Sequence, residues 1–346
     1  MSRQLTYAEA LSEGLVQSMQ RDDSIFVTGI AVDYPSGMFG TTSEALAKFG
    51  KERVFDAPAM ENALTGIAIG AAAMGKRPVI VHPRNDFMFL AMDQLLNLAS
   101  KWSYMYGGNA GRVPIVVRGI IGKGWGQGAT HSQSLHAVLA HFPGLQVVLP
   151  SAPADAKQLT IAALTGTAPT VILEHRALYG DIGEVPEDFI AAEVGKARIL
   201  REGSDVTIVA TSLMAREALT AASELEKYNI SVEVIDPRWI RPLDTQTICN
   251  SIRKTGRLIA ADITWENCGF ASEVAAMAVE KCFRDLVAPV RRITLPDCPA
   301  PVSLKLEEVF YPKASTLAKA ALSLFDRRED GDLEQIDASD QFKGPY

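Results

Sequence analysis

Cysteine is scarce in this sequence, and so are clusters of basic residues. Only four cysteines occur among 346 residues, spaced too widely and irregularly for a zinc knuckle or a disulfide framework: Cys249, Cys268, Cys282 and Cys298. We therefore expect reduced thiols. The net charge is −7, and no run of Lys and Arg exceeds a pair. A chain without a basic surplus is poorly suited to neutralise a phosphate backbone, which disfavours nucleic-acid binding.

Long apolar runs are also missing. The most apolar segment, Ala63 to Met74, is short and rich in glycine and alanine, whereas a membrane helix needs about 20 consecutive apolar residues. The first residues show a charged amphipathic pattern without the apolar centre of a signal peptide. These absences predict a cytoplasmic protein with no membrane span.

Several common catalytic signatures do not occur either. The sequence has no GxSxG nucleophile elbow, no P-loop, no HExxH motif, and no GxGxxG that opens a helix after the first strand. Ordinary hydrolase, NTPase and nicotinamide-dependent functions therefore lose their usual support.

Two kinds of segment alternate along the first half of the chain. Near-continuous apolar runs, which strands covered on both faces require, occur at Ile25–Thr28, Pro78–Val81, Pro114–Val117, Gln146–Leu149 and Thr170–Leu173. Segments with a helical period occur at Thr6–Gln20, Ser43–Phe49, Asn62–Met74, Leu90–Tyr104, Leu135–His141 and Ala154–Leu164. This alternation predicts an α/β domain with a mainly parallel sheet.

A polar stretch rich in Pro, Gly and Glu interrupts the pattern, which then resumes. We expect a first domain over residues 1–185, a linker over 186–203, and a second domain over 204–325. Each domain is expected to be a mainly parallel sheet flanked by helices. Residues 326–346 are acidic and hold too few apolar side chains to offset their ordering entropy, so we expect a mobile tail or a docking arm.

Glu61 is the first candidate functional residue. It lies where a short strand, Arg53–Phe55, gives way to a helix, and a helix-start acid is favoured by the helix dipole alone. The helix that follows carries almost only small and aliphatic residues (ALTGIAIGAAAMG), so the carboxylate would lie beside an apolar wall. Such surroundings suit a group that transfers protons. The residues alone leave the structural and the functional interpretation open.

His131 is the second candidate. It follows a glycine-rich run, GKGWGQGAT, whose backbone could approach a ligand closely and present the imidazole as a proton shuttle. In the alternative interpretation His131 is a loop residue at the start of a helix, with Ser132 as its cap. The sequence His-Ser-Gln directly after the run adds weight to the functional interpretation.

The order of several blocks identifies a family resemblance. VFDAPAMEN, GKRPVIV, NDFMFLAMDQLLNLASKWSYMYGG, THSQSLHAVLAHFPGLQVVLP and TVILEHRALYG resemble the beta subunit of the decarboxylating component of 2-oxo acid dehydrogenases. They also resemble the pyrimidine-binding half of transketolase. GSDVTIVATS, VEVIDPRWIRPLD and TGRLIAADITWENCGFASEVAA resemble the transketolase carboxy-terminal domain. The resemblance extends over about residues 4 to 320.

The resemblance implies a thiamine diphosphate enzyme. Glu61 matches the glutamate that hydrogen-bonds N1′ of the cofactor's aminopyrimidine and drives it to the imino tautomer, so that the 4′-nitrogen can take the thiazolium proton. Phe87 matches the aromatic residue that packs on the pyrimidine, and Met60 and Gln94 are further residues expected at the cofactor. His131 matches the histidine on the substrate side. The cofactor acts as an electron sink, while the protein supplies position and proton transfer.

One element of that family is missing from this chain. The diphosphate and its metal need a GDG segment followed by asparagine ligands, but only Gly180-Asp181 and Gly331-Asp332 occur. The resemblance therefore implies an alpha-type partner that carries the GDG motif and holds Mg²⁺, in an alpha2beta2 heterotetramer. A lipoyl acyltransferase is a further possible partner.

The substrate is left open by a departure from the family pattern. Where dehydrogenase beta subunits carry Glu and an aromatic residue, this chain has Val81 and His82, followed by Pro83 and Arg84. His82 and Arg84 either lie on the surface at a strand end, or face the cleft and favour an anionic or sugar-phosphate substrate. Three functions stay open: 2-oxo acid decarboxylation with acyl transfer, ketol transfer by a two-subunit transketolase, and a non-catalytic scaffold subunit.

Overall fold

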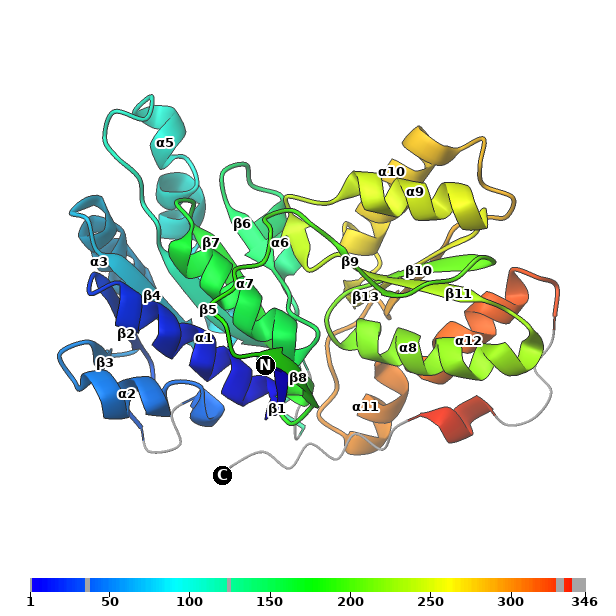
Figure 1. The fold of residues 1–346 in the computed structure, drawn as a ribbon, viewed down its shortest axis with the longest axis horizontal. Coiled ribbons are helices and arrows are strands. Elements are labelled where there is room, and N and C mark those ends of the chain that lie inside the picture. The colour runs from blue at the N-terminus through cyan, green and yellow to red at the C-terminus, as the bar shows by residue number, and fades with distance from the viewer. Residues whose placement is uncertain (1, 35–37, 123–125, 328–332, 338–346) are drawn as a thin grey trace. The chain divides into compact units, whose positions relative to one another are not determined.

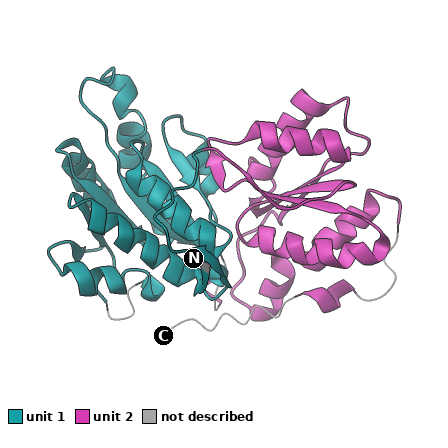
Figure 2. Cartoon of the chain, in the orientation of Figure 1, with its two compact units in different colours: residues 1–124, 130–194, 343–346 teal, residues 125–129, 195–342 magenta. Residues whose placement is uncertain are grey.

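The computed structural model describes residues 2–34, 38–122, 126–327 and 333–337. These residues form two compact units, shown in Figure 2. Unit 1 comprises the described residues of 1–124 and 130–194, and unit 2 those of 125–129 and 195–342. Among the described residues, no helix is both long enough and apolar enough to cross a membrane.

A parallel sheet forms the centre of unit 1 (Figure 1). Its strands follow one another in the order β6-β7-β5-β4-β2-β3, and every neighbouring pair is parallel, as predicted. Their bounds are β2 (Ile25–Gly29), β3 (Val54–Asp56), β4 (Arg77–His82), β5 (Val116–Ile121), β6 (Gln146–Val148) and β7 (Thr170–His175). Because the strands are parallel, the segments that follow β3, β4, β5 and β7 all leave the same edge of the sheet.

Helices flank this sheet. In chain order they are α1 (Tyr7–Arg21), η1 (Met38–Gly40), α2 (Ser43–Phe49), α3 (Glu61–Ala73), α4 (Asn85–Met88), η2 (Phe89–Ala91), η3 (Asp93–Ala99), α5 (Trp102–Met105), α6 (His136–Ala140), α7 (Pro153–Thr165) and η4 (Arg176–Leu178). Helix α1 packs on α7, and α3 packs on η2 and η3. Helix α1 begins after Thr6 because Thr6 and Glu9 form a capping box, with Thr6 N 2.7 Å from Glu9 Oε2.

Three local features differ from the sequence pattern. The expectation of one helix over Leu90–Tyr104 is wrong, because this segment is a succession of a 3-10 turn, the π-helix η3 and the short helix α5. Strand β5 extends past Val117 and β7 past Leu173. An unpredicted antiparallel pair, β1 (Ser2–Thr6) and β8 (Ile182–Pro186), completes unit 1.

Unit 2 has a second sheet, with the order β14-β13-β10-β11-β9. All its neighbouring pairs are parallel except β11 with β9. Its strands are β9 (Arg198–Arg201), β10 (Val206–Ala210), β11 (Val232–Asp236), β13 (Leu258–Trp265) and β14 (Arg291–Leu295), and a short strand β12 (Trp239–Arg241) follows β11. Strand β9 lies inside the stretch that we expected to be a linker.

Helices cover both faces of this second sheet. They are α8 (Leu213–Leu225), η5 (Glu226–Tyr228), α9 (Thr245–Thr255), α10 (Phe270–Cys282), α11 (Leu304–Phe310), α12 (Ala314–Ser323) and η6 (Leu333–Ile336). Figure 1 shows α9 and α10 on one face and α8 and α12 on the other. The prediction of parallel sheets flanked by helices is confirmed for both units.

Part of the expected mobile tail packs on unit 2. Leu333 in η6 is only 2% exposed. Ser315, at the start of α12, donates through its backbone N and its Oγ to the Asp337 carboxylate at 2.9 and 2.8 Å. The segment over residues 333–337 is therefore bound to α12 in this structure, whereas residues 338–346 lie outside the described residues.

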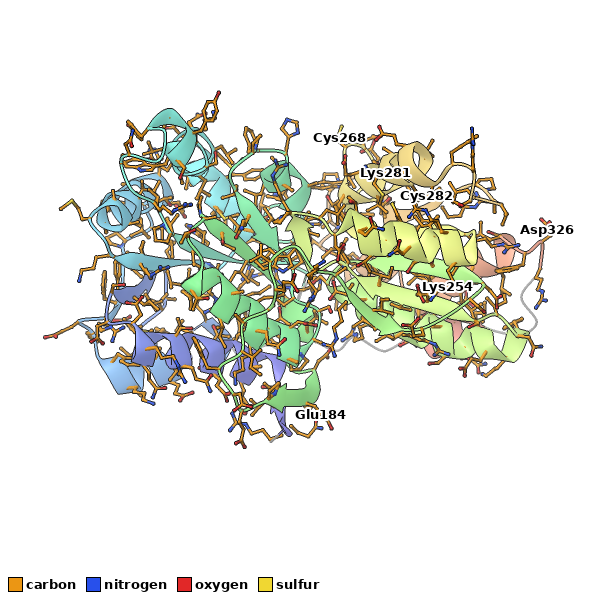
Figure 3. The ribbon with its side chains drawn as sticks, turned by 45° about the horizontal axis from the view of Figure 1, so that its top comes forward. Glu184, Lys254, Cys268, Lys281, Cys282 and Asp326 are labelled. Atoms are coloured by element: carbon orange, nitrogen blue, oxygen red, sulfur yellow. The ribbon has the colours of Figure 1, made fainter. Side chains whose placement is uncertain are left out.

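All four cysteines of the chain are free thiols. Cys268 is exposed and Cys282 is buried in α10, and both are labelled in Figure 3. Burial, with the neighbouring Cys249, raises the pKa of the Cys282 thiol to about 11. A thiol with so high a pKa is a poor nucleophile at neutral pH.

Candidate active site

The candidate residues gather at the carboxyl edge of the sheet in unit 1. Glu61 follows β3, Phe87 follows β4, and His131 lies in the segment after β5. Arg176 directly follows β7. In open α/β sheets this edge is where ligands bind, because strand ends deliver loops from several strands to one place. Lys123, Gly124 and Trp125 of the glycine-rich run lie outside the described residues.

Glu61 is the first residue of α3 and is only 8% exposed. Its carboxylate accepts no hydrogen bond from any residue that the structure describes. The backbone carbonyl of Glu61 is used inside the helix, where it accepts from Thr65 Oγ1 at 2.7 Å. Met60, the residue before the helix, is exposed. Glu61 is thus a mostly buried residue, and its carboxylate, without a protein donor, is available to a donor on a ligand.

Phe87 and His131 come from separate segments and lie against each other. Their ring centroids are 5.2 Å apart, and the ring planes meet at 76° in an edge-to-face arrangement. Phe87 is 40% exposed, so one part of its ring remains accessible. His131 Nδ1 is 2.8 Å from Thr130 Oγ1. The structure thus brings together two of the residues that the sequence singled out.

Asn85 and Asp86 bind the chain just after His131. Asn85 Nδ2 donates to the Gln133 carbonyl at 2.9 Å, and Asn85 Oδ1 accepts from Leu135 N at 3.2 Å. Asp86 Oδ1 accepts from Gln133 N at 3.2 Å and from Gln133 Nε2 at 2.8 Å. Asn85, Asp86 and Gln133 had no predicted role, although all three stand inside the blocks that carry the family resemblance. Their position beside Phe87 and His131 was the only available signal.

Gln94 lies against α3. A Cβ placed on Gly66 would be 3.1 Å from Gln94 Oε1, so the absence of a side chain at Gly66 allows Gln94 to approach the helix that begins with Glu61. Gln94 belongs to the π-helix η3, and such segments are frequent at functional sites. Helix η2 connects α4, which contains Phe87, with η3, which contains Gln94. It packs on both of them and on α3.

His82 is buried at the end of β4. It is 1% exposed, so the interpretation of His82 as a surface residue is wrong. Neither ring nitrogen has a hydrogen-bond partner among the described residues. Burial lowers the pKa of His82 to about 4, which keeps the ring neutral at pH 7. His82 therefore offers no positive charge to an anionic substrate.

Arg84 is partly buried, and its Nη1 donates to the Pro83 carbonyl at 2.5 Å. Burial lowers the pKa of Arg84, while the electrostatic interactions with Tyr179 and Asp86 act in the opposite direction. Unlike His82, Arg84 can present a positive charge near the carboxyl edge of the sheet.

A buried polar network lies between β5 and β7. Arg118 Nη2 donates to Glu174 Oε2 and to Thr41 Oγ1, both at 2.9 Å, and Tyr179 Oη donates to Glu174 Oε2 at 2.8 Å. Burial alone would lower the pKa of Arg118, but the Glu174 charge raises it. Burial, then Glu174, raises the pKa of the Tyr179 phenol. The network keeps an ion pair inside the sheet that supports the site.

Two protein-family models match this chain. The pyrimidine binding domain of transketolase matches residues 3–181, and the C-terminal domain of transketolase matches residues 195–317. Within the described residues, no group of three or more His, Cys, Asp or Glu side chains could hold a metal ion.

Curated relatives match over nearly the whole chain. The beta subunit of acetoin:2,6-dichlorophenolindophenol oxidoreductase from Cupriavidus necator is 39% identical over 331 residues, which cover 93% of this chain and 97% of the relative. The beta subunit of the pyruvate dehydrogenase E1 component from Rickettsia felis is 39% identical over 317 residues, with coverage of 92% and 97%.

A solved structure has the same fold. It is described as a split gene transketolase, an inactive beta4 tetramer, and it matches with a TM-score of 0.75 at 25% identity, covering 94% of this chain and 99% of that chain. The family resemblance inferred from the sequence blocks is thereby confirmed. The chain belongs to the thiamine diphosphate-dependent transketolase family, among the beta subunits of 2-oxo acid dehydrogenase-type enzymes.

Proposed function

We propose that this chain supplies the pyrimidine half of a thiamine diphosphate site, and that Glu61 is its activating carboxylate. One observation carries the proposal: Glu61 is 8% exposed, lies at the carboxyl edge of the sheet, and accepts no hydrogen bond from the described residues. The aminopyrimidine offers a ring nitrogen, N1′, with which such a carboxyl group can share a proton. The cofactor, when bound, supplies a nucleophilic carbon and an electron sink for cleaving a bond next to a carbonyl.

The other residues at this edge have distinct roles in the proposal. Phe87 packs on the pyrimidine with the accessible part of its ring, and Met60 and Gln94 contact the cofactor beside α3. His131 lies on the substrate side, where it holds or moves a proton during the reaction. The 5.2 Å contact between the Phe87 and His131 rings supports a common site for these two residues.

The proposal includes an alpha-type partner. The chain lacks the GDG motif that holds the diphosphate, and the relatives are named as beta subunits. We expect Mg²⁺ and the diphosphate to be held by that partner, in an alpha2beta2 heterotetramer. The inactive beta4 tetramer of the split gene transketolase shows that beta chains of that enzyme can assemble without activity.

Calorimetric titration of the isolated chain tests the division of the site. With thiamine diphosphate and Mg²⁺, the chain alone should bind weakly, and micromolar binding should appear only after an alpha-type partner is added. Micromolar binding of one cofactor per isolated chain would contradict the proposal.

The donor that fits best is a 2-oxo acid, with transfer of the acyl group to a lipoyl carrier. Two relatives are named for pyruvate and acetoin, so a small 2-oxo acid or a 2-hydroxyketone is the substrate class to assay first. Ketol transfer is the second candidate, favoured by the charge of Arg84 beside the edge of the sheet. A scaffold role is disfavoured because Glu61, Phe87 and His131 occur together.

A further inference from the structure

Two side chains that precede Phe87 bind the segment that follows His131. Asn85 and Asp86 open α4, and Gln133 and Leu135 lie in the segment that leads to α6. Four hydrogen bonds of 2.8 to 3.2 Å join the two segments. The contact between the Phe87 and His131 rings and the hydrogen bonds of Asn85 and Asp86 therefore join the same two segments.

The Asn85 side chain binds the backbone of the facing segment as a neighbouring β-strand would, by one donated and one accepted hydrogen bond. Its side-chain amide donates to the carbonyl of Gln133 and accepts from the N–H of Leu135, two residues further on. A single amide thus fixes the direction of the segment as well as its distance. Asn85 is fully buried, so water does not compete for these bonds. An exchange of its O and N atoms would lose both partners, which defines the orientation of the amide.

The Asp86 carboxylate also binds Gln133, through charge-assisted hydrogen bonds. One oxygen, Oδ1, accepts from the backbone N and from the side-chain Nε2 of Gln133. Hydrogen bonds to an ionised carboxylate are stronger than neutral ones. Asn85 Nδ2 also lies 3.3 Å from Asp86 Oδ2, which links the two anchors to each other.

Arg176 binds the backbone at His131 itself. Its Nη2 donates to the His131 carbonyl at 2.6 Å, and the Arg176 side chain is fully buried after β7. The backbone from His131 to Leu135 is therefore fixed by side chains from two strand ends. Among the described residues, the imidazole itself has one polar contact, to the exposed Thr130 hydroxyl, so we expect the backbone anchors to set the position of the ring.

We propose that Asn85 and Asp86 are positioning residues: by binding Gln133 and Leu135, they hold the His131 ring against Phe87. This inference deepens the proposed function and rests on it for its catalytic meaning, since His131 is the substrate-side histidine there. The ring contact and the anchors are properties of the chain alone and can be measured without cofactor or partner.

The test is NMR spectroscopy of the full chain labelled with ¹³C at the histidine ring carbons. The chain has five histidines, and loss of one signal in His131→Gln assigns the resonance of interest. Phe87→Leu defines the chemical shift of His131 without its aromatic neighbour. Asp86→Ala, which removes both bonds to Gln133, should move the His131 signal at least half of the way to that value. The other four signals should keep their positions.

Two variants serve as controls. Asp86→Asn keeps an oxygen that can accept both bonds, so its His131 signal should stay near the wild-type position. Asp22→Ala removes a carboxylate that accepts from Ser24 N and Oγ at the opposite end of the sheet, and it should not move the signal. If Asp86→Ala does not fold, Gln133→Ala, which removes only the bond from Nε2, should still move the signal in the same direction.

The proposal is overturned if Asp86→Ala moves the His131 signal by less than half of the Phe87→Leu displacement. It is also overturned if Phe87→Leu itself leaves that signal unchanged. In the reconstituted complex, Asp86→Ala should lower kcat about tenfold, because a misplaced acid–base group loses most of its contribution. Exchange of the cofactor's thiazolium proton, which depends on Glu61, should keep its wild-type rate. If Asp86→Ala also slowed that exchange, the defect would lie in the cofactor site of the proposed function and not in the position of His131.

Discussion

Arg118 on β5 and Glu174 on β7 form an ion pair in which both side chains are 2% exposed. A buried ion pair requires good geometry, because the cost of withdrawing two charges from water must be offset by their attraction and by further hydrogen bonds. Here Thr41 accepts from Arg118 Nη2 and Tyr179 donates to Glu174, while Arg118 Nη1 has no partner among the described residues. The pair ties together the two strands whose ends carry the segments of His131 and Arg176.

Removal of one charge of this pair should destabilise unit 1 strongly. Glu174→Gln leaves the Arg118 charge buried without its counter-charge, and we expect the free energy of unfolding to fall by about 3–5 kcal/mol. Urea denaturation measures the change. Asp33→Asn is the matched control, because Asp33 pairs with the exposed Lys51 at 2.9 Å and should cost less than about 1 kcal/mol. Equal effects of the two substitutions would contradict the account.

His82 should make the chain sensitive to acid. Its pKa is about 4 in the folded chain and 6.5 as its ordinary value, so the unfolded chain binds the proton more readily. The contribution of His82 to the free energy of unfolding is therefore fully present above pH 6.5 and is lost as the pH falls from 6.5 towards 4. The loss amounts to roughly 3 kcal/mol.

His82→Leu tests this expectation. The substitution replaces a buried imidazole that has no hydrogen-bond partner among the described residues, so stability at pH 7 should be kept or increased. The decline between pH 6.5 and 4 should become shallower by roughly the same 3 kcal/mol. An unchanged decline in unfolding free energy would show that other groups cause the acid sensitivity.

Arg84 separates the two candidate reactions. If its guanidinium faces the substrate, Arg84→Ala should raise the KM for a phosphorylated ketose by the equivalent of about 1–3 kcal/mol, with little change for pyruvate. Steady-state kinetics of the assembled complex give both constants. Arg77→Ala removes a guanidinium at the start of β4, the strand that Arg84 follows, and should change neither. Equal, small effects of Arg84→Ala on both donors would favour the 2-oxo acid reaction.

Much of the fold could be predicted from the sequence, because parallel strands leave apolar runs that a single chain reveals. The ends of β5 and β7 could not, since Arg118 and Glu174 look like surface residues until they are seen together. These partners are 56 residues apart, and each one makes the burial of the other possible. The break of the helix expected over Leu90–Tyr104 has no mark in the apolar pattern.

The candidate site, like the fold, could be predicted only in part from the sequence. Glu61, Phe87 and His131 were found through motifs, and the structure brings Phe87 and His131 into contact, while their catalytic roles remain predictions. The anchors Asn85 and Asp86 were not found, because hydrogen bonds to a backbone 47 to 50 residues away follow no periodic pattern. Their roles depend on where a loop returns, which only the folded chain shows.

In the proposed function, Glu61 activates the cofactor. Glu61→Gln keeps the size of the side chain and its hydrogen bonding, but it cannot hold or release the proton that couples N1′ to the imino tautomer. The complex with its alpha-type partner should still form and bind cofactor within about tenfold, while turnover falls by roughly two to four orders of magnitude. Glu9→Gln, at another glutamate in the first turn of a helix, should leave the rate unchanged.

The most direct measurement is the exchange of the thiazolium carbon-bound proton into deuterium oxide, followed by NMR in the assembled complex. The account predicts that Glu61→Gln slows this exchange in parallel with turnover, and that Glu9→Gln exchanges at the wild-type rate. Exchange as fast in Glu61→Gln as in wild type would contradict the assignment of Glu61, whatever happened to overall activity.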